Sequence, residues 1–110
     1  MTIQWKMVCK QSDLVSGAGV AAMVNGEQVA LFYVPESEKK VYAIGNWDPV
    51  GKANVLSRGL VAHLKNEWVV ASPLYKQHFV LASGQCLEEE VKVPYWEAKL
   101  EGDAVYIALH

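Results

Sequence analysis

The chain has 110 residues, of which 52% are hydrophobic, with 10 Lys and Arg against 12 Asp and Glu. This length is enough to bury a hydrophobic core without disulfides or a structural metal, so we expect a single domain over residues 1–110. The small negative net charge lacks the basic excess that phosphate neutralisation requires, which argues against nucleic acid as a partner.

The chain begins MTIQWKMVCK, which has no apolar stretch followed by a small-residue cleavage site. It also contains no run of about 18 apolar residues that could span a bilayer. We therefore expect a cytoplasmic protein that does not cross a membrane.

Cys9 and Cys86 stand far apart and in no Cys-x-x-Cys pair, as expected of reduced thiols. The following segment, QSDLVSGAG, is too short and glycine-rich for more than about one helical turn.

The segment VAAMVNGEQVALFYV predicts a β-hairpin. Asn25-Gly26 supplies the two positive-φ residues of a type I′ turn, which pairs Val24 with Glu27. Apolar residues occupy both faces of this hairpin, including Met23 on the second face, so we expect it to be covered on both sides. The polar run at 36–40, ESEKK, then reads as a solvated loop.

Two further hairpins follow. In LVAHLKNEWVVAS a turn at Lys65-Asn66 pairs Leu64 with Glu67. In YWEAKLEGDAVYIALH the turn is at 102–103, and apolar and polar residues alternate along both strands. Short strands separated by regular turn signals predict an all-β fold, an antiparallel β sandwich or barrel.

No signature for nucleophilic catalysis, phosphate binding or EF-hand calcium binding is present. The acidic run Glu88 to Glu90 lacks calcium-loop spacing and reads as a solvated surface. One enzyme hypothesis remains, a mononuclear metal site built from Asp48, His63 and His78. It requires the three side chains to converge on one ion at about 2.0–2.2 Å.

Two loop segments carry the most specific signal. They are AIGNWDPVGKANVLSRGLV and VASPLYKQHFVLASG, and the second hairpin separates them. In this order they resemble the two cluster-binding loops of Rieske iron–sulfur domains, whose pattern is Cys-x-His and then Cys-Pro-x-His. The resemblance rests on the spacing and on five framework residues: Leu56, Gly59, Pro73, Phe79 and Gly84.

The cluster ligands themselves are replaced. The resemblance aligns the family's two Cys positions with Asn46 and Ser72, and its two His positions with Asp48 and Tyr75. Rieske iron is held by thiolates on one side and imidazoles on the other. An amide, a hydroxyl, a carboxylate and a phenol do not supply that donor set, and Cys9 lies outside both loops, as does Cys86.

The chain more closely resembles the small subunits of assimilatory NADH-dependent nitrite reductases, through VLSRGLV, WVVASPLYKQHF and QWKMVCK among other segments. The resemblance implies a Rieske-like fold without a cluster, and no catalytic, cofactor-binding or metal residue on this chain. It also implies a partner, a large catalytic subunit that carries FAD, siroheme and a 4Fe-4S cluster and reduces nitrite to ammonium with NADH. A Rieske ferredoxin that recruits ligands from outside the loops is the alternative.

The two loops of a Rieske domain meet at one end, so the resemblance places Asn46, Asp48 and Ser72 at a common tip. Trp47, Leu74 and Tyr75 add large apolar groups there. Such groups are typical of anchors at a binding surface, which makes these three residues candidates for partner docking. The competing hypothesis is that they fold inward and fill the volume of the missing cluster.

Overall fold

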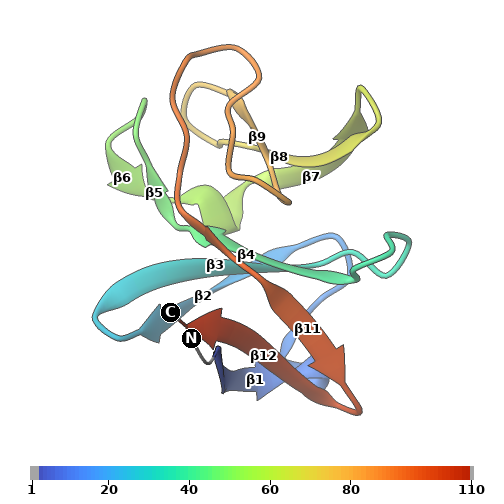
Figure 1. Ribbon diagram of the computed structural model, residues 1–110. Coiled ribbons are helices and arrows are strands. Elements are labelled where there is room, and N and C mark those ends of the chain that lie inside the picture. Colours follow the sequence, from blue (N-terminus) through green and yellow to red (C-terminus); the bar gives the residue numbers. More distant parts are fainter. Residues whose placement is uncertain (1–2, 110) are drawn as a thin grey trace.

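The computed structural model describes residues 3–109, and its strands pair antiparallel throughout that range (Figure 1). Two single-turn 3₁₀ helices, η1 (Gln11–Asp13) and η2 (Leu56–Arg58), interrupt the strands. This confirms the predicted all-β class. No helix within residues 3–109 has the length and hydrophobicity that a membrane span requires.

Two sheets form the lower part of the molecule in Figure 1. The terminal sheet has the order β1-β12-β11, and its strands are β1 (Gln4–Lys10), β11 (Ala98–Glu101) and β12 (Ala104–Leu109). The central sheet has the order β10-β4-β3-β2, and its strands are β2 (Gly19–Val24), β3 (Glu27–Tyr33), β4 (Val41–Gly45) and β10 (Tyr95–Trp96).

Two smaller sheets form the upper part of the molecule (Figure 1). One is the pair β5 (Trp47–Asp48) and β6 (Ala53–Asn54). The other, the loop sheet, has the order β7-β8-β9, with strands β7 (Leu60–Leu64), β8 (Glu67–Ala71) and β9 (His78–Val80). The upper part therefore carries both segments singled out in the sequence.

The central sheet separates two hydrophobic cores, because β3 is buried on both faces. Ala30 and Phe32 face a core shared with the upper part, whose other members include Leu56, Val70, Phe79 and Leu81. Val29 and Leu31 face a core shared with the terminal sheet, which contributes Val105 and Ile107. The strict alternation along β3 thus fixes the upper part on one face and the terminal sheet on the other.

The predicted hairpin at the Asn25-Gly26 turn is confirmed, with φ of 50° and 82° at the two turn residues and Val24 opposite Glu27. The expectation that both of its strands are covered is wrong for β2. This strand lies at the edge of the central sheet, and Met23 on it is 65% exposed. Only β3, whose alternate residues face the two cores, fulfils that expectation.

The two later hairpins also have the predicted registers. Lys65 and Asn66 both have positive φ at the β7–β8 turn. In the C-terminal hairpin, the strand before the turn serves two sheets. Trp96 pairs with Ala43 of the central sheet, and Ala98 begins a strand of the terminal sheet. This switch joins the terminal sheet to the rest of the fold.

The helix η2 was not expected from the sequence, and Gly59 follows it directly. A Cβ atom at Gly59 would overlap the carbonyl oxygen of Ala71 on β8. Only glycine therefore lets the end of η2 approach β8 this closely. The contact brings the segment after β4 against the strand that leads into the second loop.

Candidate functional site

The candidate site is formed by loop 1 (residues 46–59), which follows β4, and loop 2 (residues 72–77), which connects β8 to β9. Both loops lie in the upper part of Figure 1. They meet through the side chains of Asp48 and Ser72, which are 0% and 1% exposed. The structure therefore confirms that the two segments come together, as their resemblance to Rieske loops implied.

Ser72 Oγ donates a hydrogen bond to Asp48 Oδ2. The other oxygen, Oδ1, accepts the backbone N–H groups of Val50 at 2.8 Å and Gly51 at 3.0 Å. A buried carboxylate is costly unless its oxygens are hydrogen-bonded, and both oxygens of Asp48 have donors. Two of the four positions aligned with cluster ligands thus form a direct link between the loops.

Each loop also has local hydrogen bonds to the residue that links it to the other loop, which is Asp48 in loop 1 and Ser72 in loop 2. In loop 1, the N–H of Lys52 donates to the carbonyl of Asp48 at 2.7 Å. In loop 2, Ser72 Oγ accepts the N–H of Leu74 at 3.3 Å, and the Ser72 carbonyl accepts the N–H of Lys76 at 3.0 Å. Short polar side chains that bond to nearby backbone are typical of such turns.

Asn46, a third aligned position, is 2% exposed and anchors loop 1 to the body of the fold. Its Nδ2 donates to Gln28 Oε1 on β3 at 2.9 Å, and its Oδ1 accepts the N–H of Ser57 in η2 at 2.8 Å. Asn46 therefore has a positioning role that its polar side chain, and not a thiol, can fill.

The fourth aligned position, Tyr75, points outward and is 66% exposed. Trp47 and Leu74 are also exposed, at 49% and 45%. The three side chains therefore do not fill the interior between the loops. Leu74 instead covers Gly51, where a Cβ would overlap Leu74 Cδ1 and lie 2.9 Å from Asp48 Oδ2. We refer to Trp47, Leu74 and Tyr75 as the apolar tip.

The residues at the four aligned positions do not fit an iron–sulfur cluster of the Rieske type. Such a cluster needs two thiolates and two imidazoles. Here two of the side chains bond to each other, Asn46 bonds to Gln28 and Ser57, and the phenol of Tyr75 faces outward. Over residues 3–109, no group of three His, Cys, Asp or Glu side chains is arranged to hold a metal ion.

The mononuclear site considered from the sequence is not assembled either. His63 stacks on Trp68 with ring centroids 4.5 Å apart. His78 pairs with Glu88, and Asp48 is engaged by Ser72. The three proposed ligands therefore have separate partners within the described chain.

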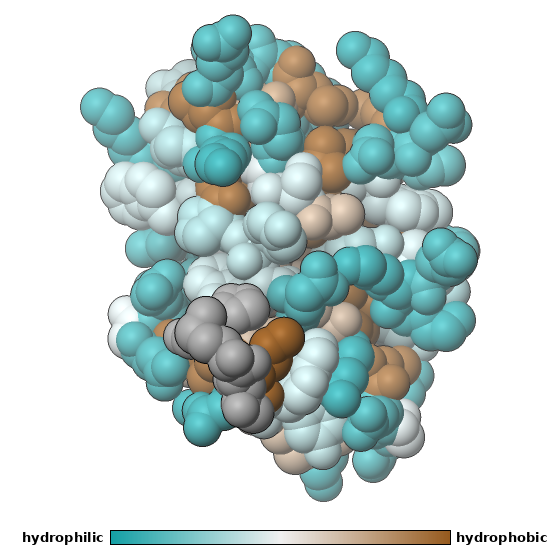
Figure 2. Space-filling model, in the orientation of Figure 1, coloured by the Kyte–Doolittle hydropathy of each residue, from teal (hydrophilic) through white to brown (hydrophobic). Residues whose placement is uncertain are grey.

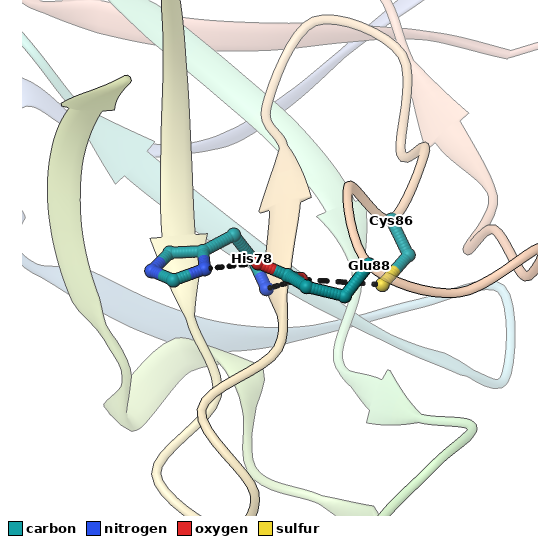
Figure 3. A network of polar contacts seen from close by, with 3 residues as sticks. All are labelled: His78, Cys86 and Glu88. Carbon is teal, nitrogen blue, oxygen red and sulfur yellow. Dashed lines mark hydrogen bonds and ion pairs between the residues drawn. The ribbon is translucent and has the colours of Figure 1, made fainter. Parts of the chain in front are cut away.

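His78, Glu88 and Cys86 form a polar network that the sequence did not reveal (Figure 3). Glu88 lies between the other two. Its Oε2 contacts His78 Nδ1 at 2.6 Å, its Oε1 accepts the backbone N–H of His78 at 2.7 Å, and Cys86 Sγ lies 3.8 Å from Oε1. The N–H of Leu87 donates to the carbonyl of His78, which sets these residues side by side.

This network affects the acidity of Glu88. Burial opposes ionisation, but the hydrogen bonds from the His78 backbone and ring outweigh it and lower the pKa of the carboxyl from its ordinary value. Glu88 thus ties the segment after β9 to the first residue of that strand. Cys86 and Cys9 are both free thiols, and burial together with Asp13 raises the pKa of Cys9.

Comparison with known proteins gives the family. A family model described as a Rieske-like [2Fe-2S] domain matches residues 4–108. A Salmonella typhimurium protein named nitrite reductase (NADH) small subunit is 45% identical over 105 residues, covering 94% of this chain and 96% of the relative. This chain belongs to the Rieske-like family of nitrite reductase small subunits.

The structural comparison agrees with this family. The NMR structure of the Escherichia coli protein NirD matches with a TM-score of 0.86 and 42% identity, covering 98% of each chain. A Klebsiella oxytoca protein named nitrite reductase NAD(P)H large subunit is 38% identical over 104 residues, which are 94% of this chain and 11% of that protein. In that protein, a segment similar to this chain is therefore part of a much longer polypeptide.

The link between the loops predicts a measurable coupling. Ser72→Ala removes a donor from a buried carboxylate and should cost about 1–3 kcal/mol of unfolding free energy. Asp48→Ala should cost more, because it also leaves the N–H groups of Val50 and Gly51 without their acceptor. Urea denaturation of both single variants and the double variant measures the coupling between the two sites. Additive effects would show that the link contributes nothing to stability.

Proposed function

We propose that this chain is the small subunit of an NADH-dependent nitrite reductase and that it acts by docking to the large catalytic subunit. The names of its relatives support the assignment to this enzyme. The observation that carries the docking proposal is the apolar tip, which presents three large side chains outward on two loops linked by Asp48 and Ser72.

In this proposal the chain carries no cluster and contributes no catalytic residue. The replaced ligand positions support it, because their side chains bond to other groups of this chain or face outward. The large subunit then supplies the redox chemistry, taking electrons from NADH through FAD, a 4Fe-4S cluster and siroheme to reduce nitrite to ammonium. We propose that this reaction takes place in the cytoplasm and serves nitrate assimilation.

The apolar tip has the properties of a binding anchor. Exposed Trp and Tyr side chains dominate interface energies, and burial of such groups against a partner removes their apolar surface from water. On the face shown in Figure 2, hydrophobic residues lie in small groups among hydrophilic ones. The tip is built on loops that are hydrogen-bonded internally, so little ordering is needed when it docks.

The Klebsiella relative supports a lasting association. A segment similar to this chain occurs there within a protein named as a large subunit. Covalent connection raises the effective concentration of a domain next to its partner. A separate chain such as this one needs a docking surface to achieve the same proximity.

The docking proposal predicts that Trp47→Ala and Leu74→Ala each weaken binding to the purified large subunit by about 1–2 kcal/mol. Melting of the free variants should change little, because both side chains are about half exposed. Titration calorimetry and thermal denaturation measure the two quantities.

Trp5→Ala is the matched control, since Trp5 is 41% exposed on β1 in the terminal sheet. It should leave affinity unchanged. Wild-type affinity in both tip variants, or a loss of affinity confined to Trp5→Ala, would move the interface away from the loops.

The cluster-free proposal predicts that the purified chain is colourless and contains no stoichiometric iron or zinc. Its melting temperature should be insensitive to chelators, because proteins that depend on a metal for folding lose stability when the metal is removed. Metal analysis, visible absorption and melting with and without EDTA check this. An absorption band with stoichiometric iron and sulfide would instead support the ferredoxin alternative.

A further inference from the structure

The exposed charges on the two loops have one sign. Within loops 1 and 2, the charged side chains are Asp48, Lys52, Arg58 and Lys76. Asp48 is buried and hydrogen-bonded, whereas the three cationic residues are exposed. The chain as a whole has a net charge of −2. The two loops therefore form a locally basic surface on a slightly acidic protein.

Two of these cations border the same hollow. Arg58 at the end of η2 and Lys76 in loop 2 line a cavity of about 280 Å³, together with Gly59, Leu60, Ala71, Ser72 and Pro73. Within residues 3–109, neither cation has an acidic side chain within salt-bridge distance, and the same holds for Lys52. The hollow thus combines apolar walls with two cations that the fold leaves without counter-charges.

A second hollow, next to Trp47, is different. It is lined by Trp47, Pro49, Pro94 and neighbouring residues, and it includes one charge of each sign, Glu27 and Lys92. Its formal charges cancel. Of these two hollows, only the one lined by Arg58 and Lys76 therefore carries an excess of positive charge.

We infer that the large subunit presents Asp or Glu side chains that enter the hollow between Arg58 and Lys76 while its apolar surface covers Leu74 and Trp47. This inference rests on the proposed function, since it specifies the chemistry of the partner surface at the same tip. A carboxylate complements both cations and gains strength where the apolar surroundings exclude water. A basic partner surface would be repelled at this position.

Charge reversal tests the inference. The double variant Arg58→Glu/Lys76→Glu should weaken binding to the purified large subunit at least about tenfold at roughly 50 mM NaCl. The difference from wild type should shrink at roughly 300 mM NaCl, since salt screens exposed charges. Lys6→Glu/Lys10→Glu on β1 is the matched control with the same change in net charge, and it should alter the dissociation constant less than about twofold.

The neutral pair Arg58→Gln/Lys76→Gln provides a second test if the reversed variant does not fold, and it should weaken binding about threefold. Unchanged affinity in the loop variants, with Trp47→Ala still impaired, would overturn the acidic partner surface and leave docking by the tip intact. An equal loss in the β1 control would overturn it as well, because net charge alone would explain the effect. Absence of any wild-type complex would overturn both this inference and the proposed function.

Discussion

The hydrogen bond between Ser72 and Asp48 is the interaction on which the arrangement of the two loops depends. It connects residues that are 24 positions apart, Asp48 on β5 and Ser72 directly after β8. In a Rieske domain the metal cluster connects these loops, whereas here a carboxylate, a hydroxyl and two backbone N–H groups occupy the junction. Asp48 and Ser72 are buried, and both oxygens of Asp48 have donors from the protein itself, so the polar groups of the junction are satisfied.

The link also determines what the loops present to the surroundings. With Asp48 and Ser72 directed inward, Trp47, Leu74 and Tyr75 remain outside, and the exposed charges of the two loops are all cationic. Asn46 holds the other end of loop 1 against β3 and η2. The polar residues Asn46, Asp48 and Ser72 therefore support the apolar tip, which is the surface that the proposed docking function uses.

Much of this structure could be predicted from local sequence signals. The Asn25-Gly26 and Lys65-Asn66 turns fix their own registers, and the spacing of Leu56, Gly59 and Pro73 indicated the two loops. The exposure of Met23 could not be predicted, because periodicity does not tell an edge strand from a central one. The pairings of Ser72 with Asp48 and of His78 with Glu88 depend on distant segments that only the folded chain brings together.

Hydrogen exchange of the complex tests the central claim most directly, because it locates the contact surface without any substitution. We predict that binding of the large subunit slows exchange of backbone amides in loops 1 and 2, around Trp47, Leu74 and Tyr75. Amides of β1 and β12 in the terminal sheet should exchange as they do in the free chain. Protection of the terminal sheet, with both loops unchanged, would contradict the account.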